Sequence, residues 1–435
     1  MKKLIKKFIP KFLLGWYHKS LALVGAFFYG YPSRKLIVIG VTGTKGKSTV
    51  VYLISKILEE TSYKVGVSST ILFKIADKEW TNETKQTMPG RFKLQKFFSL
   101  MVKAGCQYAV IETSSEGILQ SRHLGIDYDV AVFTNLSPEH IEAHGSYENY
   151  KQAKGQLFKG LAAIARKEIN GQKIPKIIIA NVDDKEAEYF LNFAADKKFG
   201  FGVHKTLFFN QLEEVLSQNV KIDSDGMKFS INNVNLNLKL LGEFNLYNVL
   251  AAITVGLSQR VDLSIVKRAL EKIKGIPGRL EEIENNKGYK IFVDYAHEPK
   301  GLAEVYKTIK LFDPKKIISV LGSQGGGRDK AKRPILGKLA GQYTDYVMVT
   351  NEDPYDEDPQ KIIDDVFVGV TQAGKRENQN CFRILDRREA ISKALSLAQA
   401  GDIIIITGKG SETVMAVSGG RKIPWNDRKV VRESL

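Results

Sequence analysis

The stretch that most constrains this chain runs from Gly40 to Thr49, with the sequence Gly-Val-Thr-Gly-Thr-Lys-Gly-Lys-Ser-Thr, and follows a short apolar run at 36–39. A glycine-rich turn between a strand and a helix presents backbone N–H groups at a helix N-terminus, where they bind phosphate. In such a loop Lys47 reaches the outer phosphates, and Ser48 places its hydroxyl on magnesium. The strict phosphate-loop pattern is not met, because position 41 is Val instead of Gly. The stretch predicts a nucleotide site, and ATP is the expected nucleotide.

Length, charge and cysteine usage narrow the class of protein. The 435 residues are enough for two or three domains of ordinary globular composition. The net charge of +17 admits a nucleic acid, a membrane surface or an anionic small substrate as partner. Neither an aromatic-basic RNA motif nor zinc-finger spacing accompanies the charge, so we expect no nucleic acid. Cys106 and Cys381 lie far apart, which indicates a reducing compartment, the cytoplasm, without disulfides or zinc.

The first 35 residues are basic and apolar and contain no acidic residue. Apolar residues recur at helical spacing between the lysines, and a second apolar run covers 21–31. Neither run reaches the ~20 apolar residues of a membrane span. Two interpretations stay open: residues 1–31 lie as an amphipathic helix on the anionic inner face of the membrane, or their apolar face packs on the next domain. The lysines of residues 1–31 are Lys2, Lys3, Lys6, Lys7, Lys11 and Lys19.

Strand-like and helix-like segments alternate along most of the chain, which predicts an α/β fold. After the N-terminal segment 1–35, we expect a central P-loop-type ATPase domain at 36–276, with a parallel sheet and an antiparallel β segment at 220–241. Beyond a linker at 275–278, residues 277–435 predict a Rossmann-like C-terminal domain. The expected strands are 36–39, 108–112, 130–134, 177–180, 289–293, 317–321, 346–349 and 403–406, and the expected helices are 50–58, 94–104, 147–166, 245–257 and 263–273.

Two polar clusters follow predicted strands of the central domain, where open α/β sheets place their sites. One begins at Glu112 and reads Glu-Thr-Ser-Ser-Glu-Gly, and the other ends at His140 and reads Thr-Asn-Leu-Ser-Pro-Glu-His. A carboxylate and an imidazole near the loop could both reach a magnesium ion that Ser48 binds. Magnesium prefers oxygen ligands, so His140 taken alone is more typical of a capping or hydrogen-bonded histidine.

Several motifs in a fixed order resemble the Mur ligases, from about residue 36 to the C-terminus. Within that family, Glu-x-Ser-Ser at Glu112 and Asp-Tyr-Ala-His-x-Pro at Asp294 resemble the MurE type, which adds the third amino acid to UDP-N-acetylmuramoyl-L-Ala-D-Glu. The stretches that carry the resemblance are 42–49, 112–117, 133–140, 144–145, 150–154, 242–248, 294–299 and 408–412.

The resemblance implies an ATP-dependent ligase of peptidoglycan precursor synthesis, in which ATP phosphorylates a carboxylate and an amine displaces the phosphate. Lys154 matches a lysine that the family carbamylates, which would give an anionic group for a second magnesium. Without the resemblance, Lys154 is typical of a solvated helix lysine. Positive groups would neutralise the charge that develops during phosphoryl transfer. The implied catalytic residues are Lys47, Glu112, His140, Lys154, Arg279, Asp294 and His297; the ATP contacts are Gly43, Thr44, Lys45, Gly46, Lys47, Ser48, Thr49, Asn245, Asn248 and Arg279; the magnesium ligands are Ser48, Glu112, His140 and Lys154.

The resemblance also implies two further substrates, the UDP-MurNAc dipeptide and a free amino acid such as L-lysine or meso-diaminopimelate. Arg122 suits the D-Glu carboxylate by bidentate pairing, and Arg328 suits the carboxylate of the incoming amino acid. Diaminopimelate-adding ligases have Asp-Asn-Pro-Arg where this chain has Glu-Asp-Pro-Tyr at 352–355, so a cation for the distal carboxylate is missing. We therefore expect lysine, or another amino acid without that carboxylate, to be accepted at least as well. The implied substrate residues are Thr87, Ser114, Gln120, Arg122, Arg328, Asp353, Tyr355, Gly408 and Glu412; Glu352, Asp353 and Glu412 favour a distal ammonium.

A second departure lies at the front of the chain. Members of this type usually begin with a domain of several tens of residues that grips the UDP-muramoyl part, where this chain has its 35-residue segment. A loosely held uridine or a lipid-linked acceptor would account for the difference. The alternatives are a ligase of the folylpolyglutamate or cyanophycin type and a non-catalytic nucleotide-binding protein docked on a membrane. The MurE-type motifs stand against the folate type, and the joint presence of Lys47, Glu112, His140, Lys154 and Arg328 stands against the non-catalytic protein.

Overall fold

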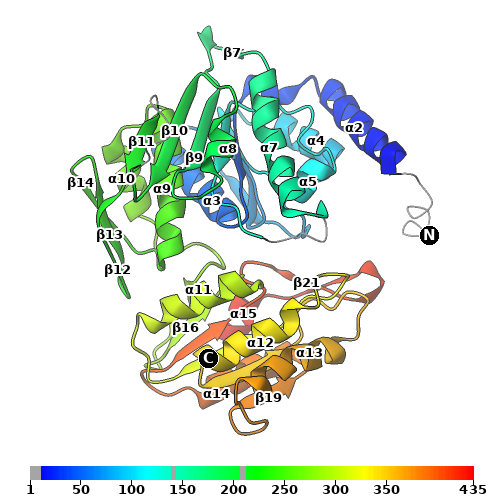
Figure 1. Ribbon diagram of the computed structural model, residues 1–435, viewed down its shortest axis with the longest axis vertical. Helices are drawn as coiled ribbons and strands as arrows, with labels where there is room; N and C mark the ends of the chain where they lie inside the picture. Colours follow the sequence, from blue (N-terminus) through cyan, green and yellow to red (C-terminus); the bar gives the residue numbers. More distant parts are fainter. Residues whose placement is uncertain (1–10, 139–143, 206–211) are drawn as a thin grey trace. The chain divides into compact units, whose positions relative to one another are not determined.

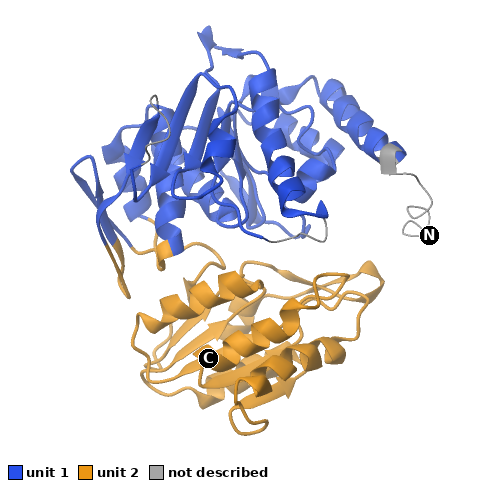
Figure 2. Cartoon of the chain, viewed as in Figure 1, with its two compact units in different colours: residues 1–220, 228–238, 244–272 blue, residues 221–227, 239–243, 273–435 orange. Residues whose placement is uncertain are grey.

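The structure is a computed structural model of the 435-residue chain, and it describes all residues except 1–10, 139–143 and 206–211. The chain divides into two compact units, each with its own sheet and hydrophobic core (Figure 2). Unit 1 comprises residues 1–220, 228–238 and 244–272, and unit 2 comprises 221–227, 239–243 and 273–435. The domain limits expected from the sequence stay a prediction.

Unit 1 is built on a nine-stranded sheet with the order β11-β10-β9-β6-β1-β5-β2-β3-β4 (Figure 1). Neighbours from β11 to β2 are parallel, and β3 and β4 continue the sheet as antiparallel strands. The predicted parallel sheet is therefore confirmed. The strands are β1 Ile37–Thr42, β2 Val65–Ser68, β3 Leu72–Ile75, β4 Lys78–Thr81, β5 Tyr108–Glu112, β6 Val130–Phe133, β9 Ile177–Asn181, β10 Lys197–Gly202 and β11 Glu213–Leu216.

The sheet of unit 1 is buried on both faces. Alternate residues of β5, Ala109 and Ile111, join one core cluster with Phe98 of α4 and Phe158 of α7. Val110 between them is also buried, as helices on both faces of a parallel sheet require, and α3 contacts β1, β2 and β5. The helices are α2 Lys11–Phe28, α3 Lys47–Glu60, α4 Arg91–Lys103, α5 Ser115–Leu119, α7 Tyr147–Ala163, α8 Ala187–Leu191, α9 Glu243–Ser258 and α10 Leu263–Glu271.

Two smaller sheets accompany the large one. β12, β13 and β14 form the predicted β segment, and two-residue connections join them in sequence order. Asn232 and Asn233, between β13 and β14, have φ of 46° and 64°, the left-handed pair of a hairpin turn, so these neighbours are antiparallel. The strands are β12 Gln218–Asp223, β13 Gly226–Ile231 and β14 Val234–Leu238, and the short pair is β7 Glu168–Ile169 with β8 Gln172–Lys173.

Unit 2 holds a six-stranded sheet with the order β15-β16-β20-β17-β18-β19 (Figure 1). All neighbours are parallel except β15 with β16, which confirms the expected Rossmann-like sheet. The loops after β16, β17, β18 and β20 leave at one edge, where such sheets bind ligands. The elements are β15 Glu281–Glu282, β16 Lys290–Val293, α11 Pro299–Lys310, β17 Ile317–Leu321, α12 Lys332–Tyr343, β18 Tyr346–Thr350, α13 Pro359–Gln372, β19 Cys381–Ile384, α14 Arg387–Leu397, β20 Ile403–Ile406, β21 Val414–Ala416, β22 Lys422–Pro424 and α15 Asp427–Ser434.

A buried charge cluster fixes the start of β6 to β1, the strand that leads into the glycine-rich loop. The carboxylate of Asp129 accepts from Val38 N at 2.9 Å, from Lys167 Nζ at 2.5 Å and from Lys176 Nζ at 3.0 Å. Lys167 also donates to two carbonyls of the segment 33–36, at 2.9 Å each. Burial lowers the pKa of Lys167, and the charge of Asp129 opposes that shift. The cluster therefore ties the segment before β1 to the sheet.

Replacing Asp129 with Asn should destabilise unit 1 strongly. The amide keeps the shape of the carboxylate but leaves two buried ammonium groups without their counter-charge, which costs about 3–5 kcal/mol. Urea unfolding followed by circular dichroism measures the change. Asp127→Asn is the matched control, because Asp127 pairs with an Arg34 side chain that is 60% exposed, and such pairs contribute about 1 kcal/mol or less. Equal destabilisation by the two substitutions would contradict the assignment.

Candidate functional site

The glycine-rich loop joins β1 to α3 and is held from the side by Asn135, which follows β6. Thr44 N donates to Asn135 O at 2.8 Å, and Lys45 N donates to Asn135 Oδ1 at 2.9 Å. Gly46 caps α3 with a φ of 82°, a left-handed conformation that favours glycine. The helix therefore begins at Lys47 with its N-terminus at the loop, as phosphate binding requires.

Two lysine ammonium groups reach the same carbonyl of this loop. Lys47 Nζ donates to Gly43 O at 3.1 Å and to Thr44 O at 2.8 Å, and Lys154 Nζ donates to Gly43 O at 2.6 Å. Lys154 is 1% exposed and lies 4.3 Å from the centre of the Tyr150 ring. The solvated position that the sequence alone indicates for Lys154 is therefore wrong. The fold brings this lysine of α7 onto the phosphate loop.

Ser48 and Glu112 form a polar corner at the start of α3. Ser48 Oγ donates to Glu112 Oε2 at 2.8 Å, and the same oxygen accepts from Thr70 N at 2.7 Å. A hydroxyl beside a buried carboxylate offers hard oxygen donors, so these two residues fit Mg²⁺. Within residues 11–138, 144–205 and 212–435, no three His, Cys, Asp or Glu side chains gather as a metal site. His140, a further predicted ligand, lies outside the described residues.

The two predicted adenine-side residues also reach the loop. A Cβ atom at Gly46 would collide with Asn248 Oδ1, so Asn248 of α9 lies directly against the turn. Asn248 Nδ2 donates to Asn245 Oδ1 at 2.9 Å, and both side chains are buried. The structure therefore places Asn245 and Asn248 beside the phosphate loop, although they are distant from it in sequence.

His144 connects the segment after β5 to α7. Its Nε2 lies 3.1 Å from Ser115 Oγ, and its ring centre lies 5.0 Å from that of Tyr150. Burial lowers the pKa of His144, and the positive charge of Lys154 lowers it further. The neutral imidazole is therefore the form expected at neutral pH. Ser114, a predicted substrate residue, caps α5 by accepting from Gly117 N at 3.2 Å.

The predicted acceptor residues lie together in unit 1. Thr87 Oγ1 is 3.0 Å from Thr70 Oγ1. The backbone N–H of Thr70 in turn donates to Glu112 Oε2. Arg122 donates to Gln120 Oε1 at 2.7 Å, to Gln86 Oε1 at 3.0 Å and to the carbonyl of residue 88. A chain of hydrogen bonds therefore connects the polar corner of the loop to Thr87, beside the segment that Arg122 binds.

Arg91, the first residue of α4, lies beside the predicted acceptor residues but is not among them. Its Nε donates to Gln120 O at 2.6 Å, so two guanidinium groups meet on one glutamine. Arg91 Nη2 and Arg122 Nε are buried and have no hydrogen-bond partner among the described residues. Burial lowers the pKa of both groups, and the charge of Arg122 lowers that of Arg91 further. Such a pair suits an anion. The signal in the sequence is a cation in the first turn of a helix, where the dipole disfavours it.

In unit 2, the predicted residues after the linker surround Tyr295. The carboxylate of Asp294 accepts from two backbone N–H groups, at 2.8 and 2.6 Å, and so fixes the local chain. The Arg279 guanidinium lies 4.4 Å from the centre of the Tyr295 ring, and His297 Nδ1 lies 2.8 Å from Tyr295 O. Asp294 therefore positions the backbone, while Arg279 supplies the positive charge of this cluster.

Lys409 lies in the middle of the predicted amino-acid residues of unit 2. Its Nζ donates to Asp353 Oδ1 at 2.9 Å, to Glu412 Oε2 at 2.6 Å and to Val414 O at 2.8 Å, and the side chain is fully buried. Lys409 is not among the predicted site residues. The sequence predicts that three carboxylates favour a distal ammonium of the substrate. Two of them, Asp353 and Glu412, instead bind the ammonium group of Lys409.

Glu352 follows β18 and is completely buried. Neither carboxylate oxygen has a hydrogen-bond partner among the described residues. Burial, and secondarily the charge of Asp353, raises the pKa of Glu352 to about 7, against the opposing effect of Arg387 and other cations nearby. A Cβ atom at Gly408, whose φ is 103°, would collide with Glu352 Oε2. Gly408 therefore makes room for this carboxylate.

Tyr355 and Arg328 lie together at the same edge of the sheet. Burial raises the pKa of Tyr355, Asp353 raises it further, and the positive charge of Arg328 opposes that shift. A Cβ atom at Gly326 would lie 2.7 Å from the Tyr355 ring, so the glycine-rich stretch that carries Arg328 packs closely on the tyrosine. The structure thus brings together the two residues of unit 2 that sequence analysis assigned to the two ends of the amino acid.

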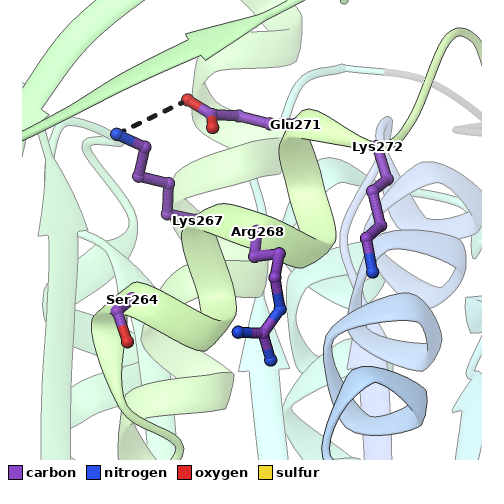
Figure 3. Close-up of a pocket in the computed structure, with 5 residues that line it drawn as sticks. All are labelled: Ser264, Lys267, Arg268, Glu271 and Lys272. Atoms are coloured by element: carbon purple, nitrogen blue, oxygen red, sulfur yellow. Dashed lines mark ion pairs between the residues drawn. The ribbon is translucent and has the colours of Figure 1, made fainter.

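A surface pocket of about 380 Å³ lies on α10, away from these clusters (Figure 3). Two of its residues, Arg268 and Lys272, bind Glu60, the last residue of α3, at 2.6 to 2.8 Å. The glycine-rich loop lies at the first residue of that helix, and a 14-residue helix is about 21 Å long. We assign the pocket no part in the chemistry. It is lined by Ser264, Lys267, Arg268, Glu271 and Lys272.

Comparison with known proteins identifies the family. The Mur ligase middle domain matches residues 41–256, and the Mur ligase glutamate ligase domain matches 278–410. A UDP-N-acetylmuramyl-tripeptide synthetase of Roseiflexus sp. (strain RS-1) is 36% identical over 428 residues, which cover 96% of this chain and 82% of the relative. A UDP-N-acetylmuramoyl-L-alanyl-D-glutamate–2,6-diaminopimelate ligase of Bacillus cereus is 37% identical over 432 residues, which cover 98% and 84%.

Solved structures agree with this result. A UDP-N-acetylmuramoyl-L-alanyl-D-glutamate–2,6-diaminopimelate ligase has a TM-score of 0.60 at 30% identity, and the match covers 92% of this chain and 78% of that one. A folylpolyglutamate synthase of Mycobacterium tuberculosis has a TM-score of 0.66 at 17% identity, over 89% and 92%, and shares the fold. The chain therefore belongs to the Mur ligase family and is an ATP-dependent ligase.

Proposed function

We propose that this ligase adds the third amino acid, a diamino acid, to UDP-MurNAc-L-Ala-D-Glu in peptidoglycan precursor synthesis. The observation that carries the proposal is the hydrogen-bond chain from Ser48 through Glu112 and Thr70 to Thr87, which joins the phosphate loop to the acceptor residues. Relatives whose names state this activity are 36–37% identical to the chain over nearly its whole length.

The proposed reaction has two steps. Arg122 pairs with one carboxylate of D-Glu. The other carboxylate attacks the γ-phosphorus of ATP, the bond to ADP breaks, and an acyl phosphate forms. The amine of the incoming amino acid then attacks the acyl carbon, loses a proton, and expels inorganic phosphate with the C–O electron pair. Lys47 stabilises negative charge that develops on the transferred phosphoryl group. Arg328 holds the carboxylate of the incoming amino acid by bidentate pairing.

Ser48 and Glu112 would hold Mg²⁺, with His140 and a carbamylated Lys154 as the remaining ligands of the predicted set. When bound, Mg²⁺ neutralises charge on the phosphoryl oxygens. Carbamylation would convert the Lys154 ammonium into an anion. It would also remove one of the two like charges that meet at Gly43 O.

The amino-acid end of unit 2 supports a substrate without a distal carboxylate. Tyr355 stands where diaminopimelate-adding ligases have an arginine, and its phenol carries no positive charge. Glu352 offers two carboxylate oxygens that accept from no described group. Lys409 already occupies Asp353 and Glu412. We therefore propose that L-lysine is accepted at least as well as meso-diaminopimelate.

We also propose that residues 1–31 place the ligase against the inner face of the membrane as a peripheral protein. None of the helices in the described part of the chain is long and apolar enough to cross a bilayer. What supports a surface contact is composition, since the segment combines six lysines with apolar residues and has no acidic residue.

Phosphate release should require ATP, the UDP-MurNAc dipeptide and the amino acid together. Lys154→Met keeps the length and burial of the side chain but removes the amine, and we expect kcat to fall roughly 10²–10³-fold, as when a transition-state charge partner is lost. Lys159→Met, an exposed lysine of the same helix, is the matched control and should keep wild-type activity. Phosphate release without the dipeptide, or an unimpaired Lys154→Met variant, would rule the proposal out.

Amide formation with L-lysine should be at least as efficient as with meso-diaminopimelate. Tyr355→Arg should raise kcat/KM for meso-diaminopimelate about tenfold relative to lysine, because a charged hydrogen bond contributes ~1.5 kcal/mol or more. Tyr355→Phe should leave the ratio unchanged. Competition assays with both amino acids measure the ratio. A strong preference of the wild-type enzyme for meso-diaminopimelate would overturn this assignment.

Glu352 should make stability depend on pH. The folded protein keeps the proton of this carboxyl up to a pKa of about 7, against an ordinary value of 4.5, so the folded state binds more protons between these values. Stability therefore falls as pH rises from about 4.5 to 7.

Glu352→Gln removes the titrating group, so the variant should gain up to about 3 kcal/mol relative to wild type between pH 5 and pH 8. Denaturant midpoints at several pH values measure the difference. Glu357→Gln is the control, because the pKa of Glu357 is lowered to about 2 and its charge does not change in this range. Parallel pH profiles of Glu352→Gln and wild type would refute the assignment.

A further inference from the structure

Helix α2 turns its small residues toward unit 1. Ala22 and Ala26 are buried, and a Cβ atom at Gly25 would lie 3.2 Å from the side chain of Phe92 on α4. A Cβ atom at Gly125 would lie 2.7 Å from Ala26. Figure 1 shows α2 beside α4, and the two helices are in contact. The interpretation that this segment packs on the next domain is therefore correct for one face of α2. That face consists of small residues.

Seven large apolar side chains of α2 are exposed, and we call them the α2 stripe. One of them, Phe28, also contacts α4, with its ring centre 5.5 Å from that of Phe92. The seven side chains recur at three- and four-residue spacing, which places them on one face of the helix. A helix that packs on a core normally exposes its polar face instead. Of the 17 large apolar side chains exposed in the described part of the chain, seven lie on this helix, so they form a patch and are not scattered singly. The α2 stripe consists of Leu13 (49% exposed), Trp16 (74%), Tyr17 (58%), Leu23 (52%), Val24 (56%), Phe27 (73%) and Phe28 (68%).

The positive charge of the first 35 residues indicates that the surface covering this stripe is an anionic bilayer. The first 35 residues contain lysines and arginine but no aspartate or glutamate, and Lys19 is exposed on α2 itself. Basic residues beside an apolar helix face are attracted to anionic headgroups while the apolar face enters the boundary of the acyl region. Trp16 and Tyr17 are the residue types that membrane proteins place at that interface.

Helix α2 adjoins the acceptor residues of unit 1, because it contacts α4, the helix that begins at Arg91. Arg91 and Arg122 meet on Gln120 and carry buried N–H groups without a partner among the described residues. The cluster that suits an anionic acceptor therefore includes the first residue of the helix on which α2 packs.

We propose that the α2 stripe docks on an anionic bilayer and that Arg91 and Arg122 receive the acceptor at that surface. The first half deepens the peripheral membrane contact proposed above by naming the side chains that make it. The second half rests on the proposed ligase activity, which the first half does not require.

Cosedimentation of the full chain with vesicles tests the docking. We expect binding to vesicles of phosphatidylglycerol and phosphatidylcholine, and a partition coefficient at least tenfold lower for Trp16→Glu/Phe27→Glu. Ile335→Glu/Val368→Glu changes two residues of unit 2 with 49% and 50% exposure and should bind as wild type does. Equal binding of Trp16→Glu/Phe27→Glu and wild type, or a wild-type chain that stays in the supernatant, would overturn the proposal.

Two further measurements separate the alternatives. Sedimentation equilibrium should show the same oligomeric state for wild type and Trp16→Glu/Phe27→Glu; a dimer that only the wild type forms would assign the stripe to a second copy. With an acceptor linked to lipid in the vesicles, the variant should form amide at least tenfold more slowly, at an unchanged rate on the soluble acceptor. An equal effect on both acceptors would refute the second half, whereas inactivity of every form with any acceptor would refute the proposed function and leave the vesicle result standing.

Discussion

In the phosphate loop, the carbonyl oxygen of Gly43 accepts hydrogen bonds from two lysine ammonium groups. Lys47 and Lys154 donate to Gly43 O at 3.1 and 2.6 Å, one from the start of α3 and the other from α7. Like charges at this separation repel each other, and burial of Lys154 strengthens the repulsion. Phosphates of ATP or a carbamate on Lys154 would each relieve it. Nucleotide binding and lysine modification would therefore stabilise the same corner of the fold, where β1, α3 and α7 meet.

The central strands of both sheets could be predicted, because buried parallel strands are continuous apolar runs: β9, β6, β1 and β5 in unit 1, and β16, β20, β17 and β18 in unit 2. The segments 108–112, 317–321 and 403–406 have the bounds in the structure that the sequence predicts for them. The outer strands β11, β10, β2, β3 and β4 of unit 1 and β15 and β19 of unit 2 are not among the expected ones. In β3 and β4, charged residues interrupt the apolar pattern, and β4 is mostly exposed. Backbone hydrogen bonds to neighbouring antiparallel strands hold β3 and β4 in the sheet. Backbone pairing requires no apolar run in the sequence, so the sequence pattern does not reveal these strands.

Some of the candidate site residues follow from a continuous sequence motif, whereas others are defined by contacts between residues far apart in the sequence. The loop residues follow from one continuous motif, and the resemblance to a family supplies Lys154, whose contact with Gly43 spans 111 positions of the chain. Neither source assigns a role to Arg91 or Lys409. Lys409 stands in a glycine-rich loop, where a lysine is ordinarily exposed, yet it is completely buried between two carboxylates. A pairing between distant side chains has no periodicity, so it becomes visible only once the strands are arranged.

This buried lysine changes the electrostatic argument at the amino-acid end of unit 2. Three carboxylates at 352, 353 and 412 suggest a strongly anionic site, but Lys409 compensates one charge of the pair that binds it. Burial keeps a proton on Glu352 until the pH approaches its pKa of about 7. The negative charge available to a distal ammonium is therefore smaller than the sequence suggests, and it grows as pH rises through neutrality. The proposed discrimination against a distal carboxylate would then depend mainly on the cation that is missing at Tyr355.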